Sequence, residues 1–133
     1  MTGGIRVLLI DDEKVFVDSL TKVLTRRGMH VKSVYDGHSG LKLLANEEFD
    51  VIVLDLRMPG LDGLATLKVI RERDTLTPVL LLTGHIDLKQ VSESLQEGAA
   101  EVLLKPCPVE TLVSAIENAY ERKSFATEIA KIS

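Results

Sequence analysis

Short apolar runs alternate with longer amphipathic stretches along this sequence, and that alternation is what most restricts its fold. The runs are rich in Val, Ile and Leu, and they are Ile5–Ile10, Val31–Val34, Val51–Leu54, Val79–Leu82 and Val102–Leu104. Runs this short and this apolar are typical of strands that are buried on both faces of a parallel sheet. Because helix-period segments separate them, we predict an α/β fold, a doubly wound five-stranded parallel sheet with helices on both faces.

The amphipathic stretches carry apolar residues at helical spacing, which predicts five helices. Their core-facing stripes are predicted to be Phe16, Leu20, Val23 and Leu24; Leu41, Leu44 and Ala45; Leu64, Leu67 and Ile70; Leu88, Val91 and Leu95; and Val109, Leu112, Val113, Ile116, Ala119 and Tyr120. Gly28 and Gly98 are predicted to end the first and the fourth of these helices.

The C-terminal residues form a separate question. We predict one domain over residues 1–122 and a C-terminal tail or helix extension over residues 123–133. Phe125, Ile129 and Ile132 repeat at helical spacing, but on a continuous helix Phe125 falls roughly 180° from Ile116. We favour a frayed or kinked terminus. The alternative is an apolar stripe that binds a partner or a second copy, as in a homodimer.

Composition excludes several classes of function. The 133 residues fit one domain, and a net charge of −4 with no Trp disfavours direct binding to nucleic acid. The longest apolar runs have four residues, too few to cross a membrane. The single cysteine, Cys107, excludes an internal disulfide, favours a cytoplasmic location and is expected to pack as a small hydrophobe.

Polar residues follow four of the five predicted strands. In an open parallel sheet, ligands bind beyond the carboxyl ends of the strands. The residues at those ends are Asp11 and Asp12, then Asp55, then Thr83, then Lys105 and Pro106. Each one alone has an ordinary explanation as a helix cap, a turn residue or a solvated charge. Their occurrence at four strand ends together indicates a site for phosphate chemistry.

The chemistry of this set is specific. Three carboxylates repel one another unless a cation lies among them, and hard oxygen ligands suit Mg²⁺. Lys105 adds a positive charge and Thr83 a hydroxyl donor, so the set can stabilise a phosphoryl group in transfer. An aspartate can itself be the nucleophile, which gives an acyl phosphate.

These residues resemble the receiver domain of bacterial two-component response regulators. The resemblance rests on four segments in the expected order, Ile10-Asp11-Asp12-Glu13, Asp55 through Gly63, Leu82-Thr83-Gly84 and Leu104-Lys105-Pro106, and it extends over roughly residues 5–122. It implies a flavodoxin-like fold with strand order 2-1-3-4-5, in which the first and third strands are neighbours.

The resemblance also implies a role for each acidic residue. Asp55 would be the phosphoacceptor. Asp12 would bind Mg²⁺ directly, Asp11 would act mostly through metal-bound water, and the backbone carbonyl of Arg57 would complete the protein's share of the metal ligands.

Further residues are expected to act at the phosphoryl group or in the switch. Thr83 would hydrogen-bond the acyl phosphate, Lys105 would pair with it, and the Lys105–Pro106 bond would be cis. One departure concerns Val102, where family members often carry a Tyr or Phe whose movement relays the signal. His85 follows the threonine at a variable position; a role in ordering or obstructing a water is weighed against an exposed loop residue, which we favour.

The resulting hypothesis is a signalling receiver, not a turnover enzyme. A sensor histidine kinase or a histidine phosphotransfer protein would phosphorylate Asp55 with Mg²⁺, and a downstream protein would read the face made by the fourth helix, fifth strand and fifth helix. Since 133 residues leave no room for an output domain, we expect a stand-alone regulator, a phosphate relay or a piece of a longer chain.

Other classes fit the sequence less well. A Mg²⁺-dependent phosphohydrolase with an aspartyl nucleophile needs an acid–base aspartate two residues later, where Arg57 stands, and a lid for which there is no room. A flavin-binding module needs a phosphate loop after the first strand, where Asp11, Asp12 and Glu13 would repel the phosphate. A non-phosphorylated pseudo-receiver scaffold would not need the intact Asp, Thr and Lys set.

Overall fold

The computed structural model describes residues 4–84 and 87–132, in which strands and helices alternate along the chain. In chain order the elements are β1 (Arg6–Ile10), α1 (Lys14–Arg26), β2 (His30–Val34), α2 (Gly37–Leu44), β3 (Val51–Leu54), α3 (Gly63–Arg73), β4 (Val79–Thr83), α4 (Leu88–Gln96), β5 (Glu101–Leu104) and α5 (Val109–Ile132). No helix within the described ranges combines the length and the apolar character that crossing a membrane requires.

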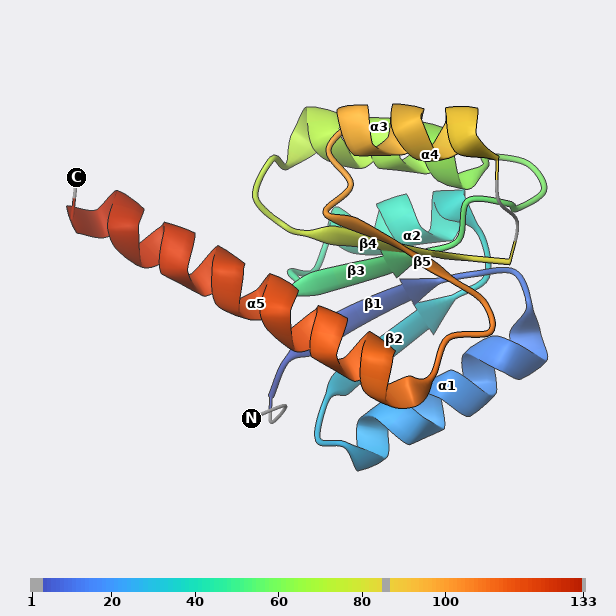
Figure 1. The fold of residues 1–133 in the computed structure, drawn as a ribbon, viewed down its shortest axis with the longest axis horizontal. Helices are drawn as coiled ribbons and strands as arrows, with labels where there is room; N and C mark the ends of the chain where they lie inside the picture. Colours follow the sequence, from blue (N-terminus) through green and yellow to red (C-terminus); the bar gives the residue numbers. More distant parts are fainter. Residues whose placement is uncertain (1–3, 85–86, 133) are drawn as a thin grey trace.

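All five strands run parallel in one sheet of order β2-β1-β3-β4-β5 (Figure 1), which confirms the predicted fold class and strand order. The register pairs Ile10 of β1 with Val34 on one side and Leu54 on the other. Consequently β1, β2 and β3 end at the same level, and the residues that follow them emerge at one edge of the sheet.

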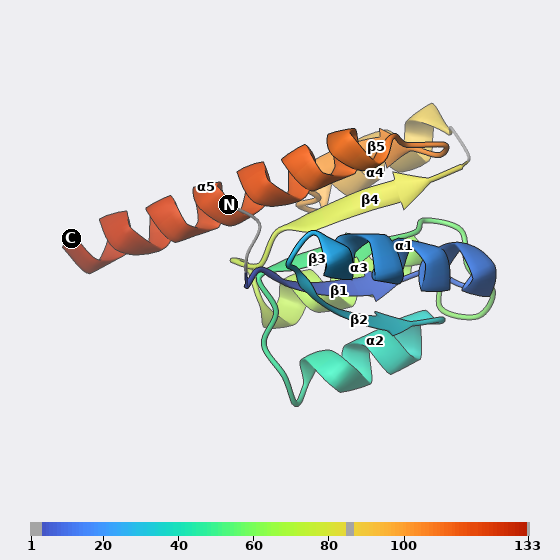
Figure 2. The ribbon, with the colours of Figure 1, turned by 90° about the horizontal axis from the view of Figure 1, so that it is seen from below.

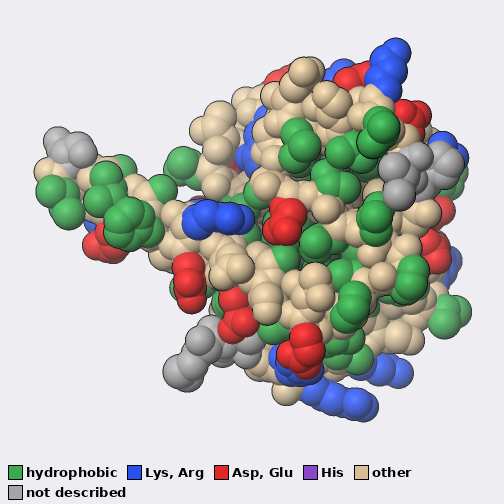
Figure 3. Space-filling model, in the orientation of Figure 1, with side chains coloured by type: hydrophobic (Ala, Val, Ile, Leu, Met, Phe, Trp, Pro, Cys, Tyr) green, Lys and Arg blue, Asp and Glu red, His purple; other side chains and the backbone are tan. Residues whose placement is uncertain are grey.

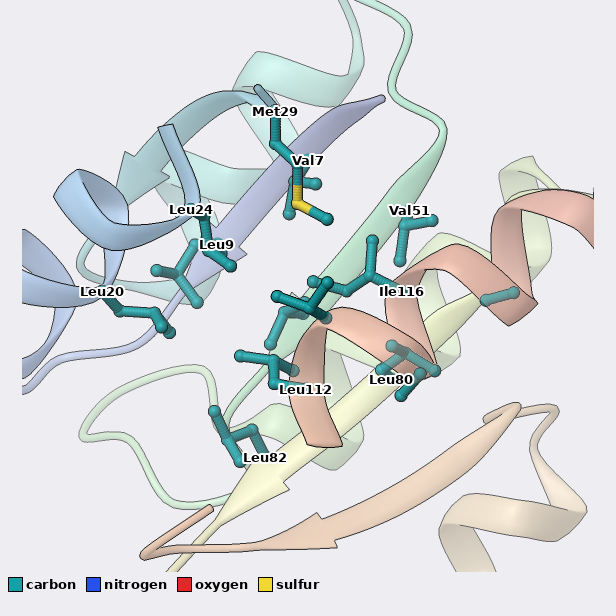
Figure 4. Close-up of a cluster of buried hydrophobic side chains, with 14 of the residues drawn as sticks. Val7, Leu9, Leu20, Leu24, Met29, Val51, Leu80, Leu82, Leu112 and Ile116 are labelled. Carbon is teal, nitrogen blue, oxygen red and sulfur yellow. The ribbon is translucent and has the colours of Figure 1, made fainter. Parts of the chain in front are cut away.

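Alternate residues of the strands build two separate cores, one on each face of the sheet. On the first face, Leu9, Val53 and Leu80 pack against α1 and α5 (Figure 4). On the second, Leu8 and Ile52 pack against α2 and α3. Figure 1 shows the sheet between these two helical layers, and in Figure 2 the layer of α1 and α5 lies in front of the sheet. Because strand side chains point alternately to opposite faces, a strand that is apolar at every position requires helices on both.

The predicted strand limits lie within one residue of the observed ones, and two predicted helix ends are confirmed. Gly28 and Gly98 follow α1 and α4 with φ angles of 91° and 99°. In this left-handed region a side chain costs energy, so glycine is the favoured residue after the last helical turn. Ala45, predicted to face the core, lies just past the end of α2 and is exposed.

The predicted orientation of α4 is wrong at two of the three stripe residues, Leu88 and Leu95, whereas Val91 is partly buried. Leu88 and Leu95 were expected to face the core but are 79% and 48% exposed, whereas Ser94 is buried. The Ser94 hydroxyl donates to the carbonyl oxygen of Gln90 at 2.7 Å, so its burial leaves no polar atom without a partner. Helix α4 lies at the edge of the sheet, where the sheet covers only part of its circumference. Spacing identified the apolar stripe, but the helix packs on another side.

The frayed or kinked C-terminus that we favoured is also wrong. Residues 123–132 continue α5 as one α-helix that ends at Ile132 and projects beyond the sheet (Figure 1). Its first half buries Leu112, Ile116 and Ala119 against the core, as predicted. In its second half Phe125, Ile129 and Ile132 are exposed, so the second stripe faces away from the body of the domain.

We predict that the two halves of α5 respond very differently to the same substitution. Ile116→Ala removes a fully buried side chain from the core and should lower the free energy of unfolding by about 2–5 kcal/mol. Ile129→Ala, on the exposed part of the same helix, should change it by less than about 0.5 kcal/mol. Urea unfolding at low protein concentration measures both values. Equal losses in the two variants would contradict the assignment of Ile116 to the core.

Candidate functional site

The carboxyl ends of β1 and β3 bring two aspartates together. The Asp55 amide donates to the carbonyl oxygen of Ile10 at 3.0 Å, and the Asp11 amide donates to that of Val34 at 3.2 Å. Each of these aspartates is therefore held by the sheet's own hydrogen-bond ladder at the point where its strand ends. Both side chains are buried.

Asp12 completes an acidic cluster that fits a divalent cation. One carboxylate oxygen from each of Asp11, Asp12 and Asp55 lies within 4.8 Å of the others, close enough for the three residues to hold one hydrated ion between them. Asp12 is only half-buried, so the cluster opens to solvent on its side. Oxygen-only donors with room for water are the arrangement that Mg²⁺ favours. The donor set therefore fits the cation that the sequence predicted.

Lys105 supplies the positive charge at this cluster. Its Nζ lies 2.7 Å from Asp11 Oδ2, 2.8 Å from Glu13 Oε1 and 3.6 Å from Asp55 Oδ2. The Lys105 amide donates to the carbonyl oxygen of Thr83 at 2.8 Å, which fixes the start of the side chain beside β4. The bond from Lys105 to Pro106 is cis, as the resemblance implied.

Burial and neighbouring charges shift the pKa values of two groups in this cluster, Asp55 and Lys105. Burial, followed by the charge of Asp11, raises the pKa of Asp55, and the Arg57 amide, Lys105 and Thr83 counter this only partly. For Lys105, burial lowers the pKa, but hydrogen bonds to Asp11 and Glu13 outweigh burial and the net pKa is raised. Lys105 is thus held in its charged form, while ionised Asp55 is destabilised.

The loop after Asp55 is shaped by two glycines, for different reasons. Gly60 has a φ of 75°, which other residues rarely adopt. Gly63 begins α3 with no space for a side chain, because a Cβ there would overlap the carbonyl oxygen of Asp55 and lie 2.5 Å from Leu56 Cα. The Arg57 amide donates to Asp55 Oδ1 at 3.2 Å, so the start of the loop also orients the Asp55 carboxylate.

The remaining predicted residues occupy different surroundings. Thr83 ends β4 and is fully buried. Val102 lies in β5 beside Leu81 and packs, partly buried, against the second core. Pro106 is exposed after the cis bond. His85 lies outside the described residues. The roles predicted for these four side chains stay predictions.

Sequence reasoning missed two neighbours of Lys105. Glu13 was quoted as part of the acidic segment but given no role at the site, and Phe16 was assigned only to the core. Phe16 presents its ring 4.5 Å from Lys105 Nζ, a cation–π contact, and still packs against the first core. The signal for Glu13 was its place as the third consecutive acidic residue; nothing in the spacing pointed to Phe16.

Comparison with known proteins gives a consistent result. The family model described as "Response regulator receiver domain" matches residues 7–117. Among curated proteins, the chain is 32% identical over 129 residues to the regulatory protein AtoC of Escherichia coli, and 36% identical over 119 residues to the DNA-binding transcriptional regulator NtrC of Salmonella typhimurium. These alignments include 97% and 90% of this chain but only 28% and 25% of those proteins, so the chain spans about a quarter of their length.

Solved structures agree in fold and in extent. A response regulator receiver domain from Clostridium thermocellum has a TM-score of 0.87 and 32% identity, with 92% of this chain and 98% of that chain aligned. The receiver domain of the Francisella response regulator 1452 has a TM-score of 0.83 and 30% identity, with 90% and 98% aligned.

We predict that Asp55→Asn stabilises the metal-free protein at neutral pH. The folded state raises the pKa of Asp55 above the ordinary 3.8, so above that raised pKa the ionised carboxylate opposes folding. The gain should be greatest at neutral pH and should shrink as the pH falls through the folded-state pKa of Asp55, because the wild-type carboxyl then becomes neutral too.

Urea unfolding in EDTA between about pH 4 and pH 8 tests this dependence. Asp50→Asn is the matched control, since Asp50 precedes β3 where Asp55 follows it, and its carboxylate accepts the Arg6 amide at 2.8 Å, which an asparagine oxygen can also do. A gain for Asp55→Asn that is independent of pH would contradict the electrostatic cause.

Proposed function

This chain belongs to the response regulator receiver domain family of two-component signalling, and we propose that it accepts a phosphoryl group on Asp55. The observation that carries the proposal is the convergence at one sheet edge of three carboxylates with oxygens within 4.8 Å and the Lys105 ammonium. A buried, desolvated carboxylate beside a cation-binding cluster is suited to act as a nucleophile.

We infer that the protein donor is a sensor histidine kinase or a histidine phosphotransfer protein, which carries the phosphoryl group on an imidazole nitrogen. A carboxylate oxygen of Asp55 attacks phosphorus, and the bond from phosphorus to the donor imidazole nitrogen breaks. The electron pair stays on that nitrogen, which then takes a proton. The product is an acyl phosphate on Asp55.

The chain's own residues hold the cation and the phosphoryl oxygens in this proposal. Asp12 and Asp55, with Asp11 acting mostly through water and the Arg57 carbonyl, would hold Mg²⁺, which neutralises charge on the transferring group when bound. Lys105 would leave Glu13 to pair with a phosphoryl oxygen, and the Thr83 hydroxyl would donate to another. Both donors already lie at the ends of neighbouring strands β4 and β5.

We propose a switch rather than a turnover enzyme. A phosphohydrolase with an aspartyl nucleophile would need an acid–base carboxylate two residues after Asp55. That position holds Arg57, whose amide already donates to Asp55. Hydrolysis of the acyl phosphate is then slow self-dephosphorylation. A pseudo-receiver scaffold remains the second alternative, and it predicts an unmodified protein.

For the output we propose the face made by α4, β5 and α5. The wrongly predicted orientation of α4 supports this proposal, since it leaves Leu88 and Leu95 in solvent on a helix that contacts β5, where Leu104 is also exposed. Figure 3 shows hydrophobic side chains gathered over this part of the surface. An apolar patch at the edge of a domain is typical of a binding surface. Thr83, which ends β4 beside β5, gives the phosphoryl group a short path to this face.

The downstream target is a protein in this proposal. Relatives such as NtrC are named as DNA-binding transcriptional regulators, but this chain aligns with only a quarter of their length. The net charge of −4 on these 133 residues favours a protein target over nucleic acid.

The first test is intact mass after incubation with Mg²⁺ and acetyl phosphate. We expect one added phosphoryl group on the wild-type chain, and none with EDTA or in Asp55→Asn, because each removes a component of the reaction. Asp50→Asn, at the opposite end of β3, should be phosphorylated like the wild type. Modification of Asp55→Asn would place the acceptor elsewhere. A wild-type chain that remains unmodified by acetyl phosphate and by a phosphorylated histidine donor would favour the scaffold alternative.

The output proposal is tested by hydrogen exchange of the phosphorylated chain. We expect phosphorylation to change the protection of amides in α4 and β5. Amides in α1 and β2, which lie near the opposite edge of the sheet, should change little. Asp55→Asn treated with acetyl phosphate is the control, and the protection of its amides in α4 and β5 should not change. Changes confined to the loop after Asp55 would contradict a readout through α4 and β5.

A further inference from the structure

We propose that a cavity at the amino ends of β1, β3 and β4 binds a small organic anion with an apolar body, such as an ionised arylalkanoic acid. The cavity has a volume of about 460 Å³. Its lining includes Arg6, which begins β1, and Asp50 and Thr77, which precede β3 and β4. The acidic cluster follows the opposite ends of the same strands, so the proposal does not depend on phosphorylation of Asp55.

Part of the lining is apolar. Leu41 of α2, Ile70 of α3 and Phe49 belong to the second core and also reach the cavity. Leu76, between α3 and β4, lines it as well but is 68% exposed. The volume is in the range of small-ligand pockets, whose linings combine apolar side chains with a few polar groups. An apolar body bound here would cover Leu76 and remove its side chain from water.

Three cations from three different elements line the same cavity. They are Arg6 of β1, Arg73 of α3 and Lys123 of α5, and Figure 1 shows α5 passing the amino ends of the strands before it projects. The Arg6 guanidinium lies 5.4 Å from the centre of the Phe49 ring. Arg73 is exposed and makes no hydrogen bond or ion pair with the described part of the chain. Guanidinium groups bind carboxylates through paired hydrogen bonds, so Arg6 and Arg73 suit an anionic head group.

Lys123 is partly buried and lacks an anionic partner at short range. Its Nζ donates to the carbonyl oxygen of Phe49 and to Thr77 Oγ1, each at 3.4 Å. Both are long hydrogen bonds to neutral oxygens, and within the described ranges no carboxylate forms an ion pair with this ammonium. Withdrawing a charge from water is costly unless an opposite charge compensates it. An anionic group of the ligand would supply that charge.

Four carboxylates also line the cavity, but other groups of the chain already hold three of them. Glu47 accepts from Lys32 at 2.5 Å, Asp50 from the Arg6 amide at 2.8 Å, and Asp74 from the amides of Leu76 and Thr77 at 2.8 and 3.1 Å. Asp74 and Lys123 attract each other only at longer range. The fourth carboxylate, Glu48, is exposed, where solvent screens its charge. The donors of Arg73 and Lys123 therefore remain available to a ligand.

The first experiment titrates the isotopically labelled full chain, unphosphorylated and in EDTA, with phenylpropionate and with its neutral analogue phenylpropionamide. Ligands of this size bind with a Kd on the order of 1 mM. We expect phenylpropionate to shift the amide NMR signals of Leu44, Phe49 and Leu76, and the amide analogue to bind at least about fivefold more weakly. Equal affinity for the two compounds, shifts centred on α4 and β5, or no saturable shift up to about 10 mM would each overturn the proposal.

The second experiment places the charge and the apolar body within the cavity. Lys123→Gln removes the ammonium and should weaken phenylpropionate binding about tenfold. Lys131→Gln is the matched control, because it makes the same change in the same helix at an exposed lysine that pairs with Glu128. Leu76→Ser should weaken binding about threefold through lost apolar contact.

Unchanged amide signals in the strands exclude misfolding of each variant. We expect the Lys131→Gln chain to bind like the wild type. Equal affinity of Lys123→Gln and Lys131→Gln would overturn the assignment of the anionic group to Lys123. Unchanged binding by Leu76→Ser would overturn the placement of the apolar body.

Discussion

The buried carboxylates of Asp11 and Asp55 can lie side by side because the Lys105 ammonium compensates their charge. Two like charges at the end of neighbouring strands would otherwise oppose folding, and burial increases that cost. Lys105 satisfies Asp11 closely at 2.7 Å but Asp55 only at 3.6 Å. Burial, followed by the charge of Asp11, raises the pKa of Asp55, and Lys105 counters this only in part. A further cation at this cluster would therefore stabilise the ionised form of Asp55.

Much of the fold could be predicted from the sequence, because a strand that is buried on both faces is recognised from its own apolar residues, without knowledge of what packs against it. A run such as Val51–Leu54 is apolar at every position, so the limits of β3 follow from composition alone. The site could be located for a related reason: parallel strands place their following residues at one edge, and the strand order that the resemblance implied makes β1 and β3 neighbours, so Asp11 and Asp55 were expected to meet. The ordinary explanation holds instead for Asp36, Asp62 and Asp87, which cap helices.

The sequence could not predict which side of a helix packs against the rest of the domain, because residue spacing does not specify the neighbouring elements. A stripe of apolar residues fixes a direction on a helix, but not what lies in that direction. For α4 the stripe containing Leu88 and Leu95 faces solvent, and Ser94 packs inward. For α5 two stripes share one helix, and only the first meets the sheet. The role of Glu13 depends on where the long Lys105 side chain ends, which local sequence does not specify.

The close packing of Gly63 on the backbone of Asp55 links this aspartate directly to α3. The Gly63 amide donates to Leu56 at 3.0 Å, and Asp62 caps the same helix by accepting the Ala65 amide at 2.9 Å. Residues 55–63 thus form a closed ring whose two ends are fixed to a strand and to a helix. Because both ends of this ring are fixed, we expect a displacement of the Asp55 peptide to move α3 with it. An insertion or deletion within residues 55–63 would therefore disturb the position of α3 more than a substitution of one of the middle residues would.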